Sequence, residues 1–495
     1  MSTSTTPTAR TAPPTAGPVP GRWLALVVLA LAQLMVVLDA TVVNIALPTA
    51  QADLGFSNDD RQWVVTGYAL VFGSLLLLGG RLSDFFGRKN MFVVGVVGFA
   101  VASAIGGAAV DFEMLIAARA LQGVFGALLA PAALALLTTT FTEPAERAKA
   151  FGIFGAIAGA GGGVGLLLGG LLTEYASWRW CLYVNLVIAV AALLGVGKLH
   201  EAVRTSRPRL DLPGALTSFV GLVALVYGLA NAERHGWSAA STLVPIILGL
   251  VVLVGFVLLE RRSTHALLPL RVVLDRNRGG AYLTIAIAGI GMFGIFLFLT
   301  YYLAGTLGFT PVQTGAAFLP MLGTLMVTAT VAGTVLVPRI GPRPMVPVGA
   351  LIAALGMALM TRLDLDSSYV GGVLPGLLII GVGLGLVFAP VQNAATAGVD
   401  PDDAGVASAM INTVQQIGGS IGTAVLSSFA ASAATSYAAS RTPSADLVAL
   451  ATLHSYHVVF WWSAGFFVAC AAVAALLFRS GPLQVDPDAA PAMAH

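Results

Sequence analysis

Fourteen long apolar stretches, separated by short polar segments, constrain the fold of this chain more than any other feature. Each is about 20 residues long, enough for an α-helix to cross a hydrocarbon core of ~30 Å. The approximate ranges are 23–47, 63–80, 91–110, 114–137, 151–173, 180–198, 212–230, 241–259, 280–304, 312–336, 345–361, 370–392, 405–431 and 458–478. Because lipid offers the backbone no hydrogen-bond partners and the period of two expected of barrel strands is missing, these runs predict helices. The sequence therefore predicts an all-α polytopic membrane protein.

Composition excludes a soluble fold. Of the 495 residues, 57% are hydrophobic and only 10% are charged, whereas soluble domains carry about 25% charged residues. The net charge of +2 gives no reason to expect a nucleic-acid partner. The two cysteines, Cys181 and Cys470, lie far apart within apolar runs. This arrangement excludes a disulfide framework or a paired-cysteine metal site as an organising feature, and we expect no metal.

The basic residues indicate the orientation. If residues 1–22 are cytoplasmic, nineteen of the 25 Lys and Arg residues fall on the cytoplasmic side, five fall outside, and Arg119 lies within a span. By the positive-inside rule, both termini are predicted to be cytoplasmic. Residues 1–22 are rich in Thr, Pro and Ala and predict a disordered tail, and 479–495 form a second tail. The excess of Arg over Lys, with abundant Gly and Ala, indicates a GC-rich bacterial genome and hence a bacterial plasma membrane.

The spans divide as six, two and six. Residues 23–199 predict an N-terminal six-helix bundle, 200–279 a linker with two extra transmembrane helices, and 280–478 a C-terminal six-helix bundle. The polar segments after the second and tenth spans also resemble each other weakly, at equivalent places in the two bundles. Duplicated bundles are typical of transporters with a substrate site at the midplane between them.

Only two ionisable side chains, Asp39 and Arg119, lie well inside the spans. Each costs about 2.5–3.5 kcal/mol at the bilayer centre and therefore requires a partner, a cavity or a function. Asp39 lies ~13 Å and Arg119 ~9 Å from the outer ends of their spans, at 1.5 Å per residue, so they can face each other. Two interpretations stay open. The pair can be structural, or Asp39 exchanges protons, with Arg119 favouring its ionised form and water-poor surroundings its neutral form.

Residues 80–89 carry one carboxylate among three cations, bounded by glycines that suit a tight turn. The positive charge can simply keep this loop inside. It can also form a conformational latch, in which the carboxylate pairs with an arginine or caps a helix in one state only. We favour both roles together. The latch residues are Gly80, Arg81, Asp84, Gly87, Arg88 and Lys89.

The fifth span holds two glycine stripes at four-residue spacing. The first stripe is Gly155, Gly159 and Gly163, and the second stripe is Gly161, Gly165 and Gly169, followed by Gly170. Small residues at this period let helices approach closely, which predicts tight packing. The alternative is that the packed surface lies between the two bundles and seals the transport pathway.

Amides and aromatic residues supply candidates for a substrate cavity. Three amides share one face of the thirteenth span and can serve as interhelical hydrogen-bonding groups or contact substrate. An aromatic run in the ninth span can line a cavity or face lipid. The candidate cavity residues are Tyr68, Gln122, Phe296, Tyr301, Asn412, Gln415 and Gln416.

Taken in order, these motifs resemble the fourteen-span drug:proton antiporter branch of the major facilitator superfamily over about residues 23–478. The matching segments are 38–48 (first-helix signature), 62–68 (start of the second helix), 80–89 (motif A), 119–123 (motif B) and 405–424 (glycine-rich thirteenth helix). The resemblance implies a monomeric, cofactor-free antiporter that exports hydrophobic or amphipathic small molecules, such as drugs or antibiotics, by alternating access. It also ties the motif B arginine, here Arg119, to proton transfer.

The chain departs from the family pattern at three places. Motif C usually reads Gly-Pro-x-x-Gly-Gly, but Leu166 stands in place of the proline within 165–170. Residues 185–189 also lack the usual proline and glycine, and Ala304 stands where glutamine is frequent. Because a proline usually bends this helix, its loss bears on how the fifth span bends or seals the transport pathway during the cycle.

Other functions are weighed on the same residues. An uptake symporter or facilitator of the same fold, or a non-transporting sensor, stays an alternative. The six histidines are dispersed, which argues against an enzyme. The sequence also lacks Gly-x-x-x-x-Gly-Lys-Ser/Thr, which argues against ATP-driven pumping. The identity of the substrate is not encoded in any of these motifs.

Overall fold

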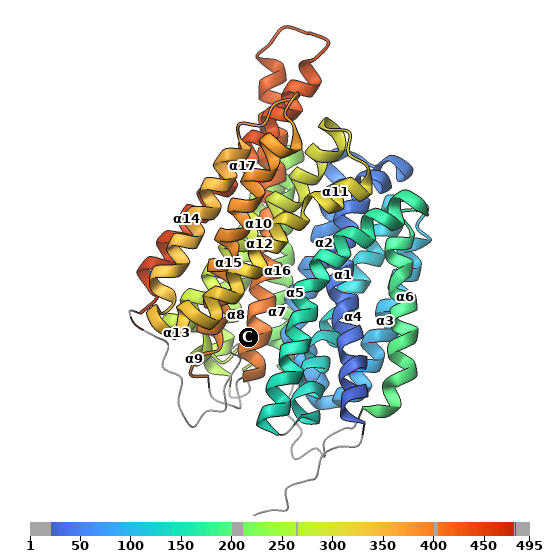
Figure 1. Cartoon of the computed structure of the whole chain (residues 1–495), viewed down its shortest axis with the longest axis vertical. Helices are drawn as coiled ribbons and strands as arrows, with labels where there is room; N and C mark the ends of the chain where they lie inside the picture. The colour runs from blue at the N-terminus through green and yellow to red at the C-terminus, as the bar shows by residue number, and fades with distance from the viewer. Residues whose placement is uncertain are drawn as a thin grey trace, which may run out of the picture.

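The computed structural model describes residues 21–141, 143–199, 211–263, 266–399, 404–479 and 481. Within these ranges the regular secondary structure is helical, which confirms the predicted fold class. The long helices run side by side in one elongated bundle (Figure 1). Most of both predicted tails, residues 200–210 of the linker and the acidic segment 400–403 lie outside the described residues.

Six helices form the N-terminal group, which packs mainly within itself. They are α1 (Arg22–Leu54), α2 (Asn58–Phe86), α3 (Arg88–Gly107), α4 (Phe112–Thr140), α5 (Pro144–Tyr175) and α6 (Trp180–Gly195), followed by the short 3₁₀ turn Val196–Lys198. Two further helices, α7 (Leu212–His235) and α8 (Ala240–Arg262), form a hairpin.

The remaining helices form the C-terminal group. They are α9 (Leu270–Val273), α10 (Arg276–Tyr301), α11 (Pro311–Ala317), α12 (Leu319–Val331), α13 (Val337–Ile340), α14 (Pro342–Met360), α15 (Leu374–Thr396), α16 (Ala404–Ala439) and α17 (Leu447–Leu477). Single π-helical turns interrupt this group at Tyr302–Thr306, Ala332–Leu336 and Tyr369–Val373. The tenth predicted span, 312–336, is divided among α11, α12 and the second of these π-helical turns, with a further break at Phe318.

Thirteen described helical segments are long and apolar enough to cross a membrane. The 32-residue α5, which lies along α1, corresponds to the remaining predicted span. Two predicted spans are too short, because α16 and α17 continue past 431 and begin before 458. They form a hairpin that projects from the bundle (Figure 1). The hydropathy of the sequence detects only the most apolar part of such helices.

The bundle has two opposite ends, the tail face and the far face. The tail face is the end at which α1 begins and α17 ends. There the backbone N–H of Arg479 donates to Asn277 at the start of α10. The far face is the opposite end, which carries α11 and the projecting α16–α17 hairpin (Figure 1).

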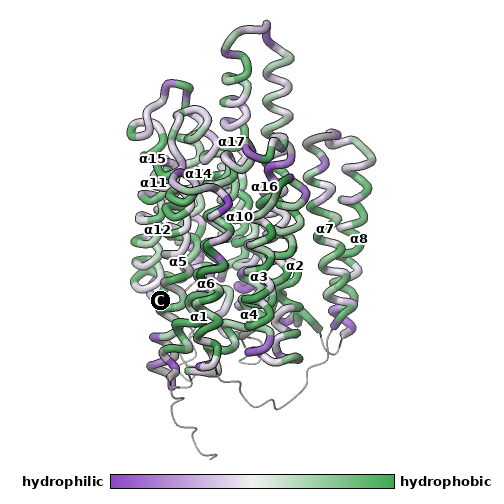
Figure 2. Tube along the Cα trace, turned by 90° about the vertical axis from the view of Figure 1, so that its right-hand side faces the viewer, coloured by the Kyte–Doolittle hydropathy of each residue, from purple (hydrophilic) through white to green (hydrophobic). Residues whose placement is uncertain are grey.

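The α7–α8 hairpin lies at one side of the bundle (Figure 2). Helix α7 contacts both α2 of the N-terminal group and α16 of the C-terminal group, which also contact each other. The buried residues at this junction are Leu70 from α2, Val226 and Ala230 from α7, and Ala424 from α16. The hairpin therefore covers one of the seams between the two groups.

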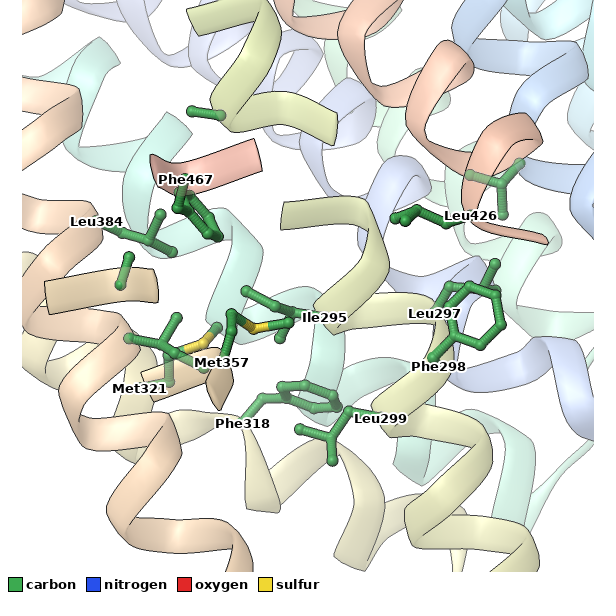
Figure 3. Packing of buried hydrophobic residues seen from close by; sticks show 14 of the residues in the cluster. Ile295, Leu297, Phe298, Leu299, Phe318, Met321, Met357, Leu384, Leu426 and Phe467 are labelled. Carbon is green, nitrogen blue, oxygen red and sulfur yellow. The ribbon is translucent and has the colours of Figure 1, made fainter. Parts of the chain in front are cut away.

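Large apolar side chains fill the C-terminal group, where α10 packs against α15, α16 and α17 (Figure 3). Glycines make this packing possible. A side chain at Gly291 of α10 would lie 2.7 Å from the ring of Phe467, and one at Gly294 would lie 2.8 Å from Leu426. Close approach at small residues is the usual source of helix association in lipid.

Candidate functional site

A carboxylate that accepts three hydrogen bonds lies at the centre of the N-terminal group. Asp39 is fully buried in α1. Its Oδ2 accepts from Arg119 Nη1 at 2.6 Å. Its Oδ1 accepts from Gln122 Nε2 at 2.8 Å and from Asn185 Nδ2 at 2.9 Å. Since an ionised carboxylate is purely an acceptor, three donors fit the charged form of Asp39.

Arg119 is held from all sides as well. Its side chain is 2% exposed. Nη1 also donates to Gln122 Oε1 at 2.8 Å, and Nε donates to the carbonyl of Val64 at 3.1 Å. The guanidinium carbon lies 4.5 Å from the centre of the Tyr68 ring, within cation–π range. The predicted pairing of the two charges at similar depth is confirmed.

Five of the six helices in the N-terminal group build this site. Helix α1 supplies Asp39, α4 supplies Arg119 and Gln122, and α6 supplies Asn185. Helix α2 supplies the Tyr68 ring and the Val64 carbonyl that contact Arg119. From α3, Ser103 Oγ accepts from Gln122 Nε2 at 2.8 Å and from Asn185 Nδ2 at 3.2 Å. This Asp39 site therefore couples the positions of nearly every helix in the group.

Sequence reasoning missed Asn185 and Ser103 as members of the site. Both are fully buried polar residues within otherwise apolar helices. At 1.5 Å per residue, Asn185 lies ~8 Å inside the start of α6 and Ser103 ~6 Å inside the end of α3. Comparing these depths with that of Arg119 is the signal that would have grouped them with the ion pair.

A small apolar cavity borders the Asp39 site on the side toward the far face. Besides Arg119, its walls come from the last turns of α1 and from α2, α4 and α6. They include Ala46, Val64, Leu115 and Cys181. The ion pair is thus bordered by apolar walls on this side, which strengthens the attraction between its charges.

Tyr68 and Asn185 each keep one buried oxygen without a hydrogen-bond partner among the described residues.

The residues predicted to line a substrate cavity lie at three separate places. Tyr68 and Gln122 belong to the Asp39 site. Phe296 packs against Phe318 of the C-terminal group with ring centres 5.4 Å apart, and Tyr301 lies near the far face. The three amides, Asn412, Gln415 and Gln416, lie on α16. Gln416 lies at the seam between α16 and α2, next to Gly73. Substrate contact by any of them stays a prediction.

The turn between α2 and α3 is tighter than the predicted loop 80–89. Helix α2 continues to Phe86 and α3 begins at Arg88, so Gly87 alone makes the turn. Its φ of 104° lies in the region that favours glycine. Gly80 lies inside α2, and the expectation that it bounds a loop is wrong, because the helix extends beyond its apolar part.

Asp84 forms the arginine pairing that the latch hypothesis requires of one state. Its Oδ1 accepts from Arg88 Nη2 at 3.0 Å and from Arg88 Nε at 3.1 Å. Both side chains are about one third exposed, so the pair contributes little to stability on its own. Its release in a second state stays a prediction.

The other two cations of this turn bind backbone carbonyls of distant segments. Lys89 Nζ donates to the carbonyl of Leu199 at 2.9 Å. Arg81 Nη2 donates to the carbonyl of Ala266 at 3.0 Å, between α8 and α9. The latch residues therefore hold the segments that lead into and out of the α7–α8 hairpin at the tail face.

The two glycine stripes of α5 face different partners. The second stripe packs on α1 within the N-terminal group. A side chain at Gly165 would lie 1.9 Å from Thr41 Oγ1, and one at Gly169 would lie 3.0 Å from the carbonyl of Val42. The packing interpretation therefore applies to the second stripe.

Gly163 and Gly170 face the C-terminal group instead. A side chain at Gly163 would meet Leu322 of α12 at 3.4 Å, and one at Gly170 would meet the carbonyl of Pro311 at 2.6 Å. The surroundings of the first stripe's other two members are not described. The surface between the two groups is thus formed by residues one or two positions away from the second stripe.

Besides the seam between α2 and α16, polar contacts join the two groups near the far face. Tyr301 Oη of α10 donates to Gln51 Oε1 of α1 at 2.8 Å, and the guanidinium of Arg61 lies 4.1 Å from the centre of the Tyr301 ring. The N–H of Val312 donates to Glu174 Oε2 at 3.0 Å. Together with the glycine contacts of α5 with α11, these interactions close the far face.

The Glu174 contact depends on charge. Hydrogen bonds from the Thr310 hydroxyl and the Val312 N–H lower the pKa of the Glu174 carboxyl below its usual value. A lowered pKa means that the contact is complete above the ordinary value for glutamate and is lost as the pH falls through the lowered one. Because this carboxyl is exposed to solvent, the effect on closure is small.

Known proteins resemble this chain over most of its length. Residues 29–423 match the Major Facilitator Superfamily. The chain is 50% identical to the puromycin resistance protein pur8 of Streptomyces alboniger, over 95% of this chain and 94% of that protein. It is 40% identical to the cephamycin export protein CmcT of Amycolatopsis lactamdurans, over 81% and 84% of the two chains.

Solved structures share the fold at low sequence identity. An auto-inhibited peptide transporter of the POT family matches with a TM-score of 0.68 at 15% identity, covering 94% of this chain and 98% of that one. An inward-facing bacterial homologue of the human lysosomal transporter Spinster matches with a TM-score of 0.64 at 16% identity, covering 93% and 98%. From its sequence, its helices and these relatives, the chain belongs to the Major Facilitator Superfamily of multi-pass membrane transporters.

Proposed function

We propose that this transporter is a proton-coupled exporter of antibiotics or related hydrophobic or amphipathic small molecules. It works as a monomer without a cofactor, in a bacterial plasma membrane, with its tail face in the cytoplasm. The buried carboxylate of Asp39, paired with Arg119, carries the proposal. The names of the relatives, which speak of puromycin resistance and cephamycin export, support the outward direction.

The proposed cycle starts from the state described here. In it Asp39 accepts three hydrogen bonds, as an ionised carboxylate does after proton release to the cytoplasm, and the far face is closed. A proton arriving from outside neutralises Asp39 and leaves Arg119 without its counter-ion. Because Asp39, Arg119 and their partners come from five helices, the weakened network lets these helices shift together. Alternating access follows when that shift is coupled to contacts at the far face.

The direction of transport can be tested in membrane vesicles. We expect inverted vesicles with an acidic lumen to accumulate puromycin or a cephamycin, because the proton gradient then runs as it does across the cell membrane. Right-side-out vesicles with an acidic exterior should not accumulate them. Accumulation only in the right-side-out vesicles would indicate the uptake symporter that the sequence left open. Empty-vector vesicles provide the baseline.

The amide donors of Asp39 should set the pH dependence of transport. Asn185→Leu removes one hydrogen bond to the carboxylate, worth about 1.5–3 kcal/mol for a charged acceptor. The ionised carboxylate would then lose one of its three donors. We expect the half-maximal point of vesicle transport to move to higher pH, because the ionised form is less strongly favoured.

Asn44→Leu is the matched control for this change. Asn44 is a buried amide of the same helix as Asp39, but it donates to the carbonyl of Ala40 in its own helix. Its replacement should leave the pH profile in place. A profile that is the same for Asn185→Leu and the wild type would contradict the role given to the amide.

A further inference from the structure

A second pair of carboxyl groups lies where the α7–α8 hairpin meets the tail face. Asp211 caps α7, and its Oδ1 accepts from the N–H of Gly214 at 2.9 Å. Glu260, near the end of α8, is only 3% exposed, and its Oε2 accepts from the N–H of Leu268 at 3.0 Å. The second oxygen of each carboxyl is buried and has no donor among the described residues.

These two remaining oxygens converge on one point. A Cβ atom at Gly214 would lie 2.6 Å from Glu260 Oε1 and 2.8 Å from Asp211 Oδ2. Both oxygens therefore lie beside the same backbone position, and the negative charge of Asp211 acts on Glu260. Two ionised carboxylates are acceptors only, so a contact of this kind needs a proton between the oxygens. Such a pair takes up and releases that proton as one unit.

No described group donates to the two remaining oxygens. Arg261 and Arg262 follow Glu260 on α8, and both are exposed. Arg81 of α2 donates to the carbonyl of Ala266 and not to the carboxylates. Of the described charged groups, Asp211 is the one whose charge acts on Glu260.

A three-residue segment connects the acid pair to the latch. Ala266 accepts from Arg81 at 3.0 Å, and Leu268 donates to Glu260 at 3.0 Å. Leu267 and Leu268 are buried, so the segment is held at both ends and in its middle. Residues 266–268 therefore link Glu260 to Arg81.

We propose that Asp211 and Glu260 form a second proton-binding site, which senses cytoplasmic pH. With one proton bound, the pair holds residues 266–268 against Arg81. When the proton leaves, two negative charges face each other, the segment moves away and Arg81 is released. This site goes beyond the transport function proposed above. It takes from that proposal only the cytoplasmic orientation of the tail face, and it does not require Asp39.

The contact can be followed with two spin labels on the purified full chain in nanodiscs. Phe86 at the end of α2 and Leu274 after α9 are both exposed, and the buried native cysteines can be replaced by alanine. In the wild type we expect the distance between the labels to be short at acidic pH and to lengthen at alkaline pH. Glu260→Gln should keep it short throughout, because an amide can donate to Asp211 and accept from Leu268.

Three comparisons separate this site from other causes. Asp211→Asn should behave like Glu260→Gln, since either change supplies the missing donor. Glu113→Gln, at an exposed acid of α4, should leave the pH response unchanged. The response should also persist in an Asp39→Asn background, which separates it from the transport proton. A distance that ignores pH in the wild type, or a wild-type response in Glu260→Gln, would overturn the proposal.

Discussion

Replacing Asp39 with asparagine should abolish proton-driven efflux. The amide cannot bind and release a proton, so the step that couples the gradient to the helices is lost. Asparagine also presents N–H donors toward Arg119, which then has no counter-ion among the described residues. Since both positions are buried, the unpaired guanidinium further disfavours the arrangement of α1 against α4.

The expected effect is large. One charge moved through 100 mV supplies about 2.3 kcal/mol, roughly a fiftyfold concentration ratio at one charge per substrate. Without coupling, the ratio reached in inverted vesicles should fall to about one. The measurement is puromycin accumulation under an imposed pH gradient, normalised to the amount of folded protein by size-exclusion chromatography.

Substrate exchange provides the control for folding. Exchange of labelled for unlabelled puromycin at equal pH needs no net proton movement, and Asp39→Asn should retain it. If exchange is lost as well, Asp39→Glu decides, because it keeps a carboxylate and should recover part of the gradient-driven transport. Undiminished gradient-driven efflux by Asp39→Asn would refute the coupling role.

Much of the fold follows from simple properties of the sequence. The length of the apolar runs gave fourteen helices, and counting residues from the span ends placed Asp39 and Arg119 at matching depth. Both estimates use distance along a helix axis. They do not give the rotation of each helix about its axis, and this rotation decides which neighbouring helix a side chain meets.

Rotation explains what could not be predicted. Gly169 and Gly170 are adjacent in sequence, yet one packs on Val42 of α1 and the other on Pro311 of α11. Ser103 is a single hydroxyl in an apolar helix, a kind of residue that commonly bonds its own backbone, so its partners were not evident. Gly315 raised no expectation, although it proves to lie at the closure of the far face.

Enlarging Gly315 to leucine should hold the far face open. An added Cβ at this position of α11 would lie 2.3 Å from the carbonyl of Leu166 in α5. The clash exists only while the two groups are in contact there, so it penalises the closed state and not the open one. Overpacking of this kind costs about 1–3 kcal/mol, which shifts a two-state equilibrium about 5–150-fold.

Spin labels at Tyr175 and Val370 report on this opening. Both residues are exposed near the far face, one at the end of α5 and the other in the π-helical turn before α15. In Gly315→Leu we expect the longer distances to dominate and vesicle transport to fall at least about tenfold. Gly323→Leu is the matched control, because a side chain there meets nothing within 4 Å. If both variants gave the wild-type distances, α5 and α11 would not form the closure, and the contacts of Tyr301 with Gln51 and Arg61 would have to hold the far face shut.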